Sequence, residues 1–121
     1  MVFSVIEGNG HRLAVALPGS VIINDLSSAL DVLAHISYNL RCDRVILHQS
    51  NINPAFFDLS TRLAGDVLQK FVTYGMKVAI AGDFSGDISQ SLRSFIAESN
   101  RGGQVCFMPD EVSAAQRLID M

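Results

Sequence analysis

Two short runs of apolar and β-branched residues open the chain, at residues 3–7 and 12–17. The segment between them contains Gly8-Asn9-Gly10, residues that tolerate a positive φ in a tight reversal. This pattern predicts an antiparallel β-hairpin at the start of the domain. A further short extended piece is expected at residues 21–23, after the turn at Pro18-Gly19.

Helices are predicted where apolar side chains recur at steps of three and four residues. The first has its N-cap at Asn24-Asp25, and its apolar face is Leu26, Leu30, Leu33, Ile36 and Leu40. The second starts at Asn53-Pro54, has its main body at residues 58–74 and stops at Gly75. Its apolar face is Leu59, Leu63, Val67, Leu68, Phe71 and Val72. The third is marked by Ile88, Leu92, Phe95 and Ile96, and a short fourth helix follows Pro109-Asp110.

Continuous apolar runs lie between these helices at residues 45–47, 78–81 and 104–108, as is typical of strands covered on both faces. The predicted order is therefore β-β-α-β-α-β-α-β-α. Such alternation predicts an α/β fold: a mostly parallel sheet with an N-terminal antiparallel hairpin and helices packed on it. Because right-handed crossovers join such strands, residues 45–47, 78–81 and 105–108 should be parallel and adjacent or near-adjacent. No linker or repeat interrupts the pattern, so residues 1–121 form one predicted domain.

The low charge content bears on the choice of partners. Of 121 residues, 49% are hydrophobic and only 17% are charged, against about 25% in ordinary soluble proteins. The net charge is −3 and the Lys and Arg residues are scattered singly, whereas nucleic-acid binding needs clustered positive charge. Nucleic acid is therefore not expected as a partner. A surface with so few charges leaves a homodimer open as one explanation of the composition.

Neither a membrane span nor a secretory signal is expected. No apolar run approaches the ~20 residues needed to cross a bilayer, and the N-terminal segment has no basic lead or cleavage site. The two cysteines, Cys42 and Cys106, share no metal-type spacing, and Cys106 lies in an apolar run where a thiol behaves as a small hydrophobe. These features favour a reducing compartment, and the predicted location is cytoplasmic.

Polar residues gather where the predicted strands end, which is where ligands usually bind in open α/β sheets. His48 ends a buried strand and is the candidate acid/base or ligand-binding residue, with Asp25 or Asp83 as candidate partners. A hydrogen-bonded structural histidine is the favoured interpretation, because no catalytic partner stands near His48 in the sequence. Several of these polar positions also suit helix N-caps, which are expected at Asn24-Asp25, Asn53 and Asp110.

No metal or cofactor is expected from the sequence. The histidines and cysteines that would have to supply metal ligands lack the spacing of such a site; they are His11, His35, His48, Cys42 and Cys106. The loop at residues 82–87 lacks the Gly-Lys-Ser/Thr ending of a phosphate-binding loop and the three-glycine spacing of a dinucleotide site. A turn that leads into a helix explains this loop.

The segment at residues 53–62 is the most informative stretch of the chain. Aromatic, acidic, hydroxyl and basic side chains crowd into the predicted first turns of one helix: Phe56, Phe57, Asp58, Ser60, Thr61 and Arg62. The two aromatic rings are more often core than ligand site, because each ring buries a large area. Arginine and aromatic residues are also the side chains that most often anchor protein interfaces. These six residues are therefore the candidate interaction surface.

A set of runs spread over nearly the full length carries a family resemblance. They are Ile22-Ile23-Asn24-Asp25, Ile46-Leu47-His48, Phe56-Phe57-Asp58-Leu59, Leu63-Ala64-Gly65, Leu68-Gln69-Lys70-Phe71, Gly82-Asp83-Phe84 and Glu98-Ser99-Asn100. Together they resemble an uncharacterised bacterial family known as domain of unknown function 4180. The resemblance implies no activity.

The element order is also similar, more loosely, to that of STAS domains, the fold of anti-sigma-factor antagonists and of sulfate-transporter tails. In that family a partner kinase phosphorylates a serine or threonine at the start of the helix after the central strand. The resemblance implies a comparable place for Ser60 and Thr61. The family's Asp-Ser-Ser/Thr-Gly signature is absent, since this chain has Phe57-Asp58-Leu59-Ser60-Thr61-Arg62 there.

The sequence thus supports two functional hypotheses from different classes. The first is a non-enzymatic regulatory or protein-interaction module whose working surface is the start of the helix at residues 58–74 and the loop after Leu47. The second is a small enzyme or ligand-binding domain that uses His48 with Asp25 or Asp83. An enzyme requires His48 and a carboxylate to converge within hydrogen-bond reach in a concave pocket, whereas an interaction module requires a flat apolar patch.

Overall fold

A computed structural model describes residues 2–121. Its strands are β1 (Phe3–Gly8), β2 (His11–Ala16), β3 (Arg44–His48), β4 (Lys77–Ala81) and β5 (Val105–Met108). Its α-helices are α1 (Leu26–Ala34), α2 (Leu63–Thr73), α3 (Gln90–Arg101) and α4 (Glu111–Asp120). The element order is the one predicted from the hydrophobic pattern. Within residues 2–121, no helix is long and apolar enough to span a membrane.

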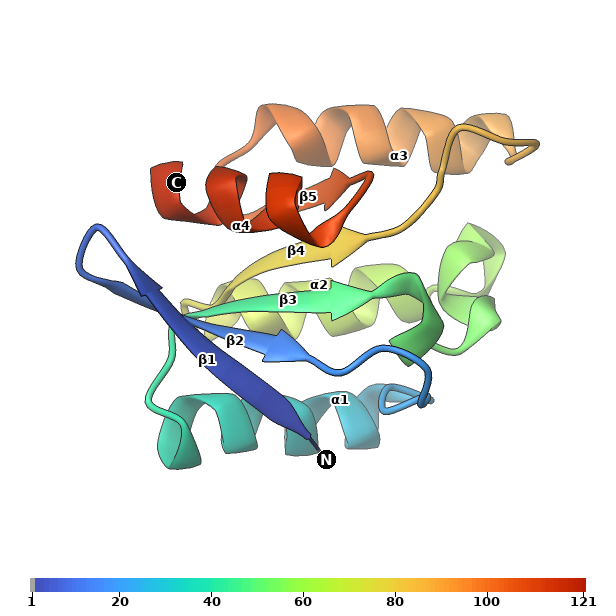
Figure 1. Ribbon diagram of the computed structural model, residues 1–121. Helices are drawn as coiled ribbons and strands as arrows, with labels where there is room; N and C mark the ends of the chain where they lie inside the picture. Colours follow the sequence, from blue (N-terminus) through green and yellow to red (C-terminus); the bar gives the residue numbers. More distant parts are fainter. Residues whose placement is uncertain (1) are drawn as a thin grey trace.

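The strands form one sheet in the order β1-β2-β3-β4-β5 (Figure 1). The pairing of β1 with β2 is antiparallel, and the three following pairings are parallel. The predicted adjacency of the three buried strands is confirmed. The hairpin turns at Asn9 and Gly10, whose φ values are 51° and 78°, as a two-residue turn between right-twisted strands requires.

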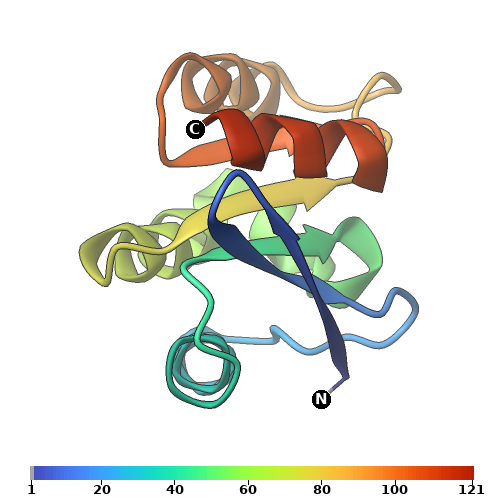
Figure 2. The same cartoon turned by 60° about the vertical axis from the view of Figure 1, so that its left-hand side comes forward.

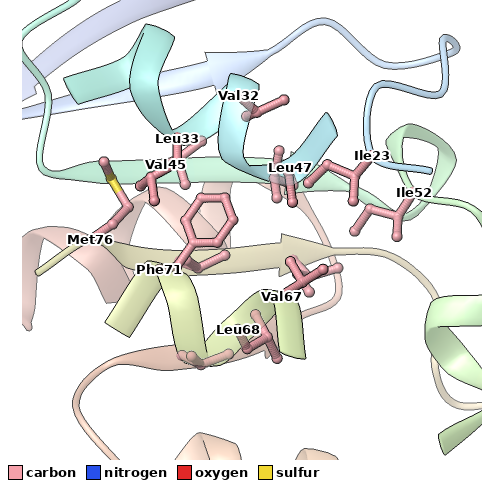
Figure 3. Close-up of a cluster of buried hydrophobic side chains, with 14 of the residues drawn as sticks. Ile23, Val32, Leu33, Val45, Leu47, Ile52, Val67, Leu68, Phe71 and Met76 are labelled. Carbon is pink, nitrogen blue, oxygen red and sulfur yellow. The ribbon is translucent and has the colours of Figure 1, made fainter. Parts of the chain in front are cut away.

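Helices cover both faces of the sheet, unequally. On the first face, side chains of α1, α2 and α3 pack on β2 to β5 in one large apolar cluster, part of which Figure 3 shows. On the second face, Ala114 and Leu118 of α4 cover a smaller cluster. In Figures 1 and 2, α4 lies in front of the sheet, beside β1. Cys106 is fully buried in the smaller cluster, which confirms its prediction as a core residue.

The end of α4 is held by a buried charge. Arg44, at the start of β3, is only 3% exposed. Its Nε donates to the carbonyl of Leu118 at 2.9 Å, and its Nη2 donates to an oxygen of Met121 at 2.8 Å. A third bond, from Nη1 to the carboxylate of Asp43 at 3.0 Å, balances the charge. These bonds satisfy carbonyls that a helix C-terminus leaves without an internal partner.

The predicted apolar face of the first helix is partly wrong. Leu30 is 37% exposed, whereas Ala29 and Val32, outside the predicted face, are buried together with Leu33. The α-helical hydrogen bonding stops at Ala34, and the chain continues as one π-helical segment, His35–Asn39. The wider turn changes the angle between successive side chains, so a fixed three- and four-residue step does not describe the whole segment.

The predicted start of the second helix is also wrong. The α-helix begins at Leu63, and the residues before it form two short 3₁₀ turns, Pro54–Phe57 and Leu59–Thr61. Arg62 separates these turns from α2 because its backbone is left-handed, with φ 65°. Asp58 accepts a bond from the backbone N–H of Ser60, and local bonds of this kind compete with helical ones. Ser60 and Thr61 therefore lie before the helix, not in its first turn.

Candidate functional site

His48 is bonded to a carboxylate that the sequence analysis did not single out. Its Nε2 lies 2.9 Å from Oε1 of Glu111, the first residue of α4. Neither Asp25 nor Asp83 bonds to His48; each instead accepts bonds from a serine close in sequence, Ser28 and Ser85 respectively. Glu111 follows the predicted cap Asp110 directly, and that position at the carboxyl end of β5 is the signal that could have pointed to it.

The His48–Glu111 pair is built as a link between β3 and α4. A histidine that acts as a general base presents one nitrogen to substrate while a carboxylate orients the other. Here the carboxylate holds Nε2, while Nδ1 is buried and has no hydrogen-bond partner within residues 2–121. The nitrogen left over for catalysis is therefore closed to solvent. This geometry favours the structural interpretation of His48.

Asn51 is a buried polar residue that sequence reasoning missed. Its side chain is completely buried, accepts a bond from the backbone N–H of His48 at 2.8 Å, and donates to the carbonyls of Leu17 and Ser20, each at 2.9 Å. Its own carbonyl accepts the N–H groups of Ile22 and Ile23. Asn51 thus ties the loop after β3 to the predicted extended piece, where Ile23 forms a single parallel bridge with Ile52.

The candidate interaction residues separate into core and surface. Phe56 is only 1% exposed and packs in the large cluster, so it lies beneath the surface, and its prediction as an interaction residue is corrected on this point. Phe57 is half-buried, with its ring 5.0 Å from Phe56 and 5.7 Å from Phe84. Asp58, Ser60, Thr61 and Arg62 are exposed. We call the accessible residues Phe57, Asp58, Ser60, Thr61 and Arg62 the 57–62 surface.

Hydrogen bonds hold the backbone of the 57–62 surface in place. Asp58 Oδ1 accepts from the hydroxyl of Ser60 at 2.7 Å and from its backbone N–H at 3.1 Å. These bonds, the hydroxyl first, lower the pKa of the Asp58 carboxyl, because they favour its ionised form. Thr61 Oγ1 lies 2.7 Å from the carbonyl oxygen of Ala55 and 2.8 Å from that of Asp58. The turn is ordered before any partner binds.

Arg62 differs from its neighbours on this surface. Its guanidinium makes no hydrogen bond or ion pair to any group in residues 2–121, and its backbone occupies the left-handed region. Arg62 thus places a cation with no internal partner on a left-handed backbone, four residues after a carboxyl whose pKa the bonds from Ser60 lower. The arrangement offers an accessible positive group and a carboxylate held by hydrogen bonds, on a segment that also carries the aromatic ring of Phe57.

The remaining histidines and cysteines serve packing. His11 lies 3.4 Å from Nη2 of Arg44, and the ring of His35 lies 5.7 Å from that of Phe3. Burial raises the pKa of Cys106 to about 11, which keeps the thiol neutral and unreactive at physiological pH. Across residues 2–121 there is no group of three or more His, Cys, Asp or Glu side chains placed to hold a metal ion.

Comparison with known proteins gives a family and a distant structural relative. A search of the curated proteins found no match. Among solved structures, the chain is similar to a protein from Thermotoga maritima assigned as an anti-sigma factor antagonist. The identity is 13%, the match covers 98% of this chain and 95% of the other, and the TM-score is 0.46. The family model described as Domain of unknown function (DUF4180) matches residues 8–118, so the chain belongs to that family.

Proposed function

We propose that the chain is a non-enzymatic regulatory module that binds a protein partner through the 57–62 surface, together with the adjoining loop after β3. The observation that carries this proposal is Arg62. A left-handed backbone costs a residue other than glycine about 1–2 kcal/mol, and strain of this kind concentrates at functional sites. Its backbone bonds to Leu59 and Asp66, but its guanidinium makes no hydrogen bond or ion pair within residues 2–121, so no polar contact of the side chain offsets the strain.

The neighbours of Arg62 suit the same role. Arginine and aromatic side chains are enriched among residues that anchor interfaces, and Phe57 supplies a half-buried aromatic ring on the same segment as Arg62. The bonds of Asp58 and Thr61 hold the turn rigid, so little conformational entropy would be lost on binding. Charges of both signs on one surface also favour one orientation of the partner over others.

The alternative, a small enzyme or ligand-binding domain that uses His48, has less support. A catalytic histidine needs a nitrogen within reach of substrate, and the free nitrogen of His48 is buried. The carboxylates proposed as its partners, Asp25 and Asp83, are bonded to serines instead. Substitution of Glu111 tests the alternative, because Glu111 is the carboxylate that His48 contacts. If the pair is structural, Glu111→Gln should lower the free energy of unfolding and leave any activity of the protein in place.

Phosphorylation of Ser60 would act differently from the expectation for a helix N-terminus. The Ser60 hydroxyl donates to Asp58, and α2 begins only at Leu63. A phosphate would therefore face the Asp58 carboxylate with only the Arg62 guanidinium to offset the repulsion. We expect Ser60→Asp to break the Asp58–Ser60 turn and to weaken partner binding together with local order.

A sharper test replaces Arg62 by glycine. This change removes the guanidinium that would bind the partner and, at the same time, relieves the backbone strain at position 62. Arg62→Gly should keep or raise the denaturation midpoint, since glycine occupies the left-handed region without cost, while the guanidinium is lost. Arg41 provides a matched control: it is also exposed and left-handed, with φ 54°, but it lies outside the 57–62 surface. Arg41→Gly should have the same effect on stability.

The measurement is a comparison of the proteins captured from extracts of the native cell by tagged wild type, Arg62→Gly, Arg62→Ala and Arg41→Gly. We expect wild type and Arg41→Gly to capture a common partner that both Arg62 variants lose. If all of these proteins capture the same set, the 57–62 surface does not bind a partner. If Arg62→Gly unfolds at lower denaturant than Arg41→Gly, Arg62 has a structural role and the proposal is wrong.

A further inference from the structure

The two edges of the sheet are treated differently. At β5, the side chain of Asn100 accepts a bond from the backbone N–H of Phe107 at 2.7 Å and donates to its carbonyl at 3.2 Å. The amide thus takes the place that a neighbouring strand would occupy. Covering an edge in this way prevents another chain from pairing with it.

The edge at β1 has no such cover. In an antiparallel pair, alternate residues exchange bonds with the partner strand, and the residues between them point their backbone groups outward. Gly8 and His11 are the hydrogen-bonded pair that closes the two-residue turn. At the other end of the hairpin, the N–H of Leu17 donates to the carbonyl of Val2 at 3.1 Å. Even-numbered residues of β1 therefore bond to β2, and the N–H and C=O groups of Phe3, Val5 and Glu7 point away from it.

No group in residues 2–121 bonds to these outward-facing N–H and C=O groups. In both Figure 1 and Figure 2, β1 lies in front of the rest of the fold with no helix or loop drawn over it. Two features that commonly keep a free edge strand from pairing with another chain are also missing from β1. Residues 2–8 contain no lysine or proline, and the register from Phe3↔Ala16 to Gly8↔His11 is continuous, without a bulge.

Several side chains beside this edge are apolar and exposed, although Ser4, Glu111 and Gln116 also line the groove there. Val2 is 64% exposed, Ile6 40% and Val112 80%. Ser4, Ile6 and Val112 border one groove of about 330 Å³ between β1 and α4. The one charged residue of β1, Glu7, is neutralised within its own chain, because its carboxylate lies 2.6 Å from the guanidinium of Arg12. An apolar, pairing-competent edge with no uncompensated charge is suited to a strand of like composition.

We infer that β1 pairs antiparallel with β1 of a second copy, about a two-fold axis that passes beside Val5. In this register Val5 faces the partner's Val5, and Phe3 faces the partner's Glu7. Because the outward groups lie at positions 3, 5 and 7, every one of them finds its complement in the other strand. No two like charges face each other, since each Glu7 lies opposite a phenylalanine and keeps its own Arg12.

A second copy fits better than an unrelated extended peptide because the edge is self-complementary. A two-fold interface brings the same patch of both copies together, and an axis at Val5 is the one that pairs all three outward-facing residues of each strand. The result is one continuous sheet across two copies. This interface uses residues outside the 57–62 surface, so Arg62→Gly should leave the dimer intact.

The first test is Val5→Pro, with Val5→Ala as its matched control. The N–H of Val5 points outward, so proline removes a bond to the second copy without removing one to β2. We expect wild type and Val5→Ala to be dimers by light scattering after gel filtration, and Val5→Pro to be a folded monomer by circular dichroism. A wild type that stays monomeric at high micromolar concentration, or a folded Val5→Pro that stays dimeric, overturns the inference.

The second test reads the register and does not depend on the fate of Val5→Pro. With Val5 on the axis, Ser4 faces the partner's Ile6 as a non-hydrogen-bonded pair, about 4.5 Å apart at Cα, which is within disulfide range. A mixture of Ser4→Cys and Ile6→Cys chains should form a cross-linked heterodimer on mild oxidation, well above the yield of either variant alone. The native cysteines are buried and should not interfere. Equal yields from the mixture and from either variant alone would exclude this register.

Discussion

At the scale of single residues, two buried polar side chains do more to organise the fold than any candidate catalytic residue. Asn51 is completely buried and its side chain satisfies three backbone groups from two segments: the N–H of His48 at the end of β3, and the carbonyls of Leu17 and Ser20. Arg44 does the same for the end of α4. A buried donor or acceptor that loses its partner costs about 1–3 kcal/mol, so such residues are sensitive points.

Replacing Asn51 should therefore destabilise the whole domain. Asn51→Ala leaves the N–H of His48 and the two carbonyls without partners, and we expect a loss of about 3 kcal/mol in the free energy of unfolding. Urea denaturation measures the loss. Asn53→Ala is a suitable comparison, since the Asn53 side chain accepts only the N–H of Ala55 and its loss should cost about 1 kcal/mol. Equal losses for the two variants would contradict this account of Asn51.

The Asp58–Ser60 turn makes a second prediction at this scale. The Ser60 hydroxyl is the main cause of the lowered pKa of Asp58, and the Ser60 backbone N–H is the second. Ser60→Ala removes the first cause and keeps the second, so the pKa of Asp58 should rise part of the way toward its ordinary value. Carboxyl chemical shifts followed by NMR through acid titration would show this.

The chain contains its own control for that experiment. Asp83 and Ser85 form the same turn, with the Ser85 hydroxyl 2.6 Å from Asp83 Oδ1, and that bond likewise lowers the pKa of Asp83. Ser85→Ala should raise the pKa of Asp83 and leave Asp58 unchanged. A shift of both carboxyls in either variant would mean that the substitutions act through general unfolding rather than through the local bond.

At the scale of elements, the sequence predicts what depends on local pattern and misses what depends on tertiary bonds. The strands, their order and the helix caps Asp25 and Asp110 follow from apolar runs and capping preference and are confirmed, whereas Asn53 caps a 3₁₀ turn and not α2. The late start of α2 depends on the left-handed backbone of Arg62, a conformation that the arginine itself does not favour. No pattern in the sequence signals it.

The same limit applies to the candidate site. The place of His48 at the end of a strand marks it as a candidate, but its partner Glu111 lies 63 positions further along the chain. The burial of Asn51 depends on the carbonyls of Leu17 and Ser20, which only the assembled fold brings close. Phe56 and Phe57 are adjacent in sequence, yet one is core and the other half-buried, because only Phe56 is buried in the large cluster that the assembled fold creates.

The guarded edge at β5 gives an element-scale prediction. Asn100→Ala removes both bonds to Phe107 and should lower the free energy of unfolding by about 1–2 kcal/mol. It also exposes a second pairing edge, so light scattering should show species larger than those of wild type as concentration rises. Asn39→Ala, a change at an exposed asparagine away from both edges, should do neither. Unchanged association of Asn100→Ala would contradict the guarding role.

At the scale of the whole molecule, the fold gathers aspartates that precede helices at one end of the sheet. In a parallel α/β arrangement each helix follows the carboxyl end of a strand, so the residues before successive helices share that edge. Asp25, Asp58, Asp83 and Asp110 each accept bonds from a nearby serine, and each has a lowered pKa for that reason. Their contributions to stability therefore respond to pH together.

The sign of that response is fixed by the direction of the shifts. A carboxyl whose pKa is lower in the folded state than its ordinary value of 3.8 contributes stability that is fully present above that value. The contribution is lost as the pH falls through the folded pKa, because the unfolded chain then binds more protons. We expect the urea midpoint to be level near neutral pH and to fall progressively below about pH 5.

Asparagine at the two true helix caps isolates this effect. Asp25 accepts bonds from the backbone N–H and the hydroxyl of Ser28, whereas Asp110 accepts a bond from the backbone N–H of Ser113. Asparagine accepts the N–H bond equally well and does not titrate. The double variant Asp25→Asn/Asp110→Asn should be nearly as stable as wild type at pH 7 and should lose less stability between pH 5 and pH 3. Asp31→Asn/Asp87→Asn changes the net charge equally at exposed carboxylates that accept no side-chain hydrogen bond, and should retain the wild-type slope. If the two double variants respond alike, net charge rather than capping governs the acid response, and the bonded aspartates are not its source.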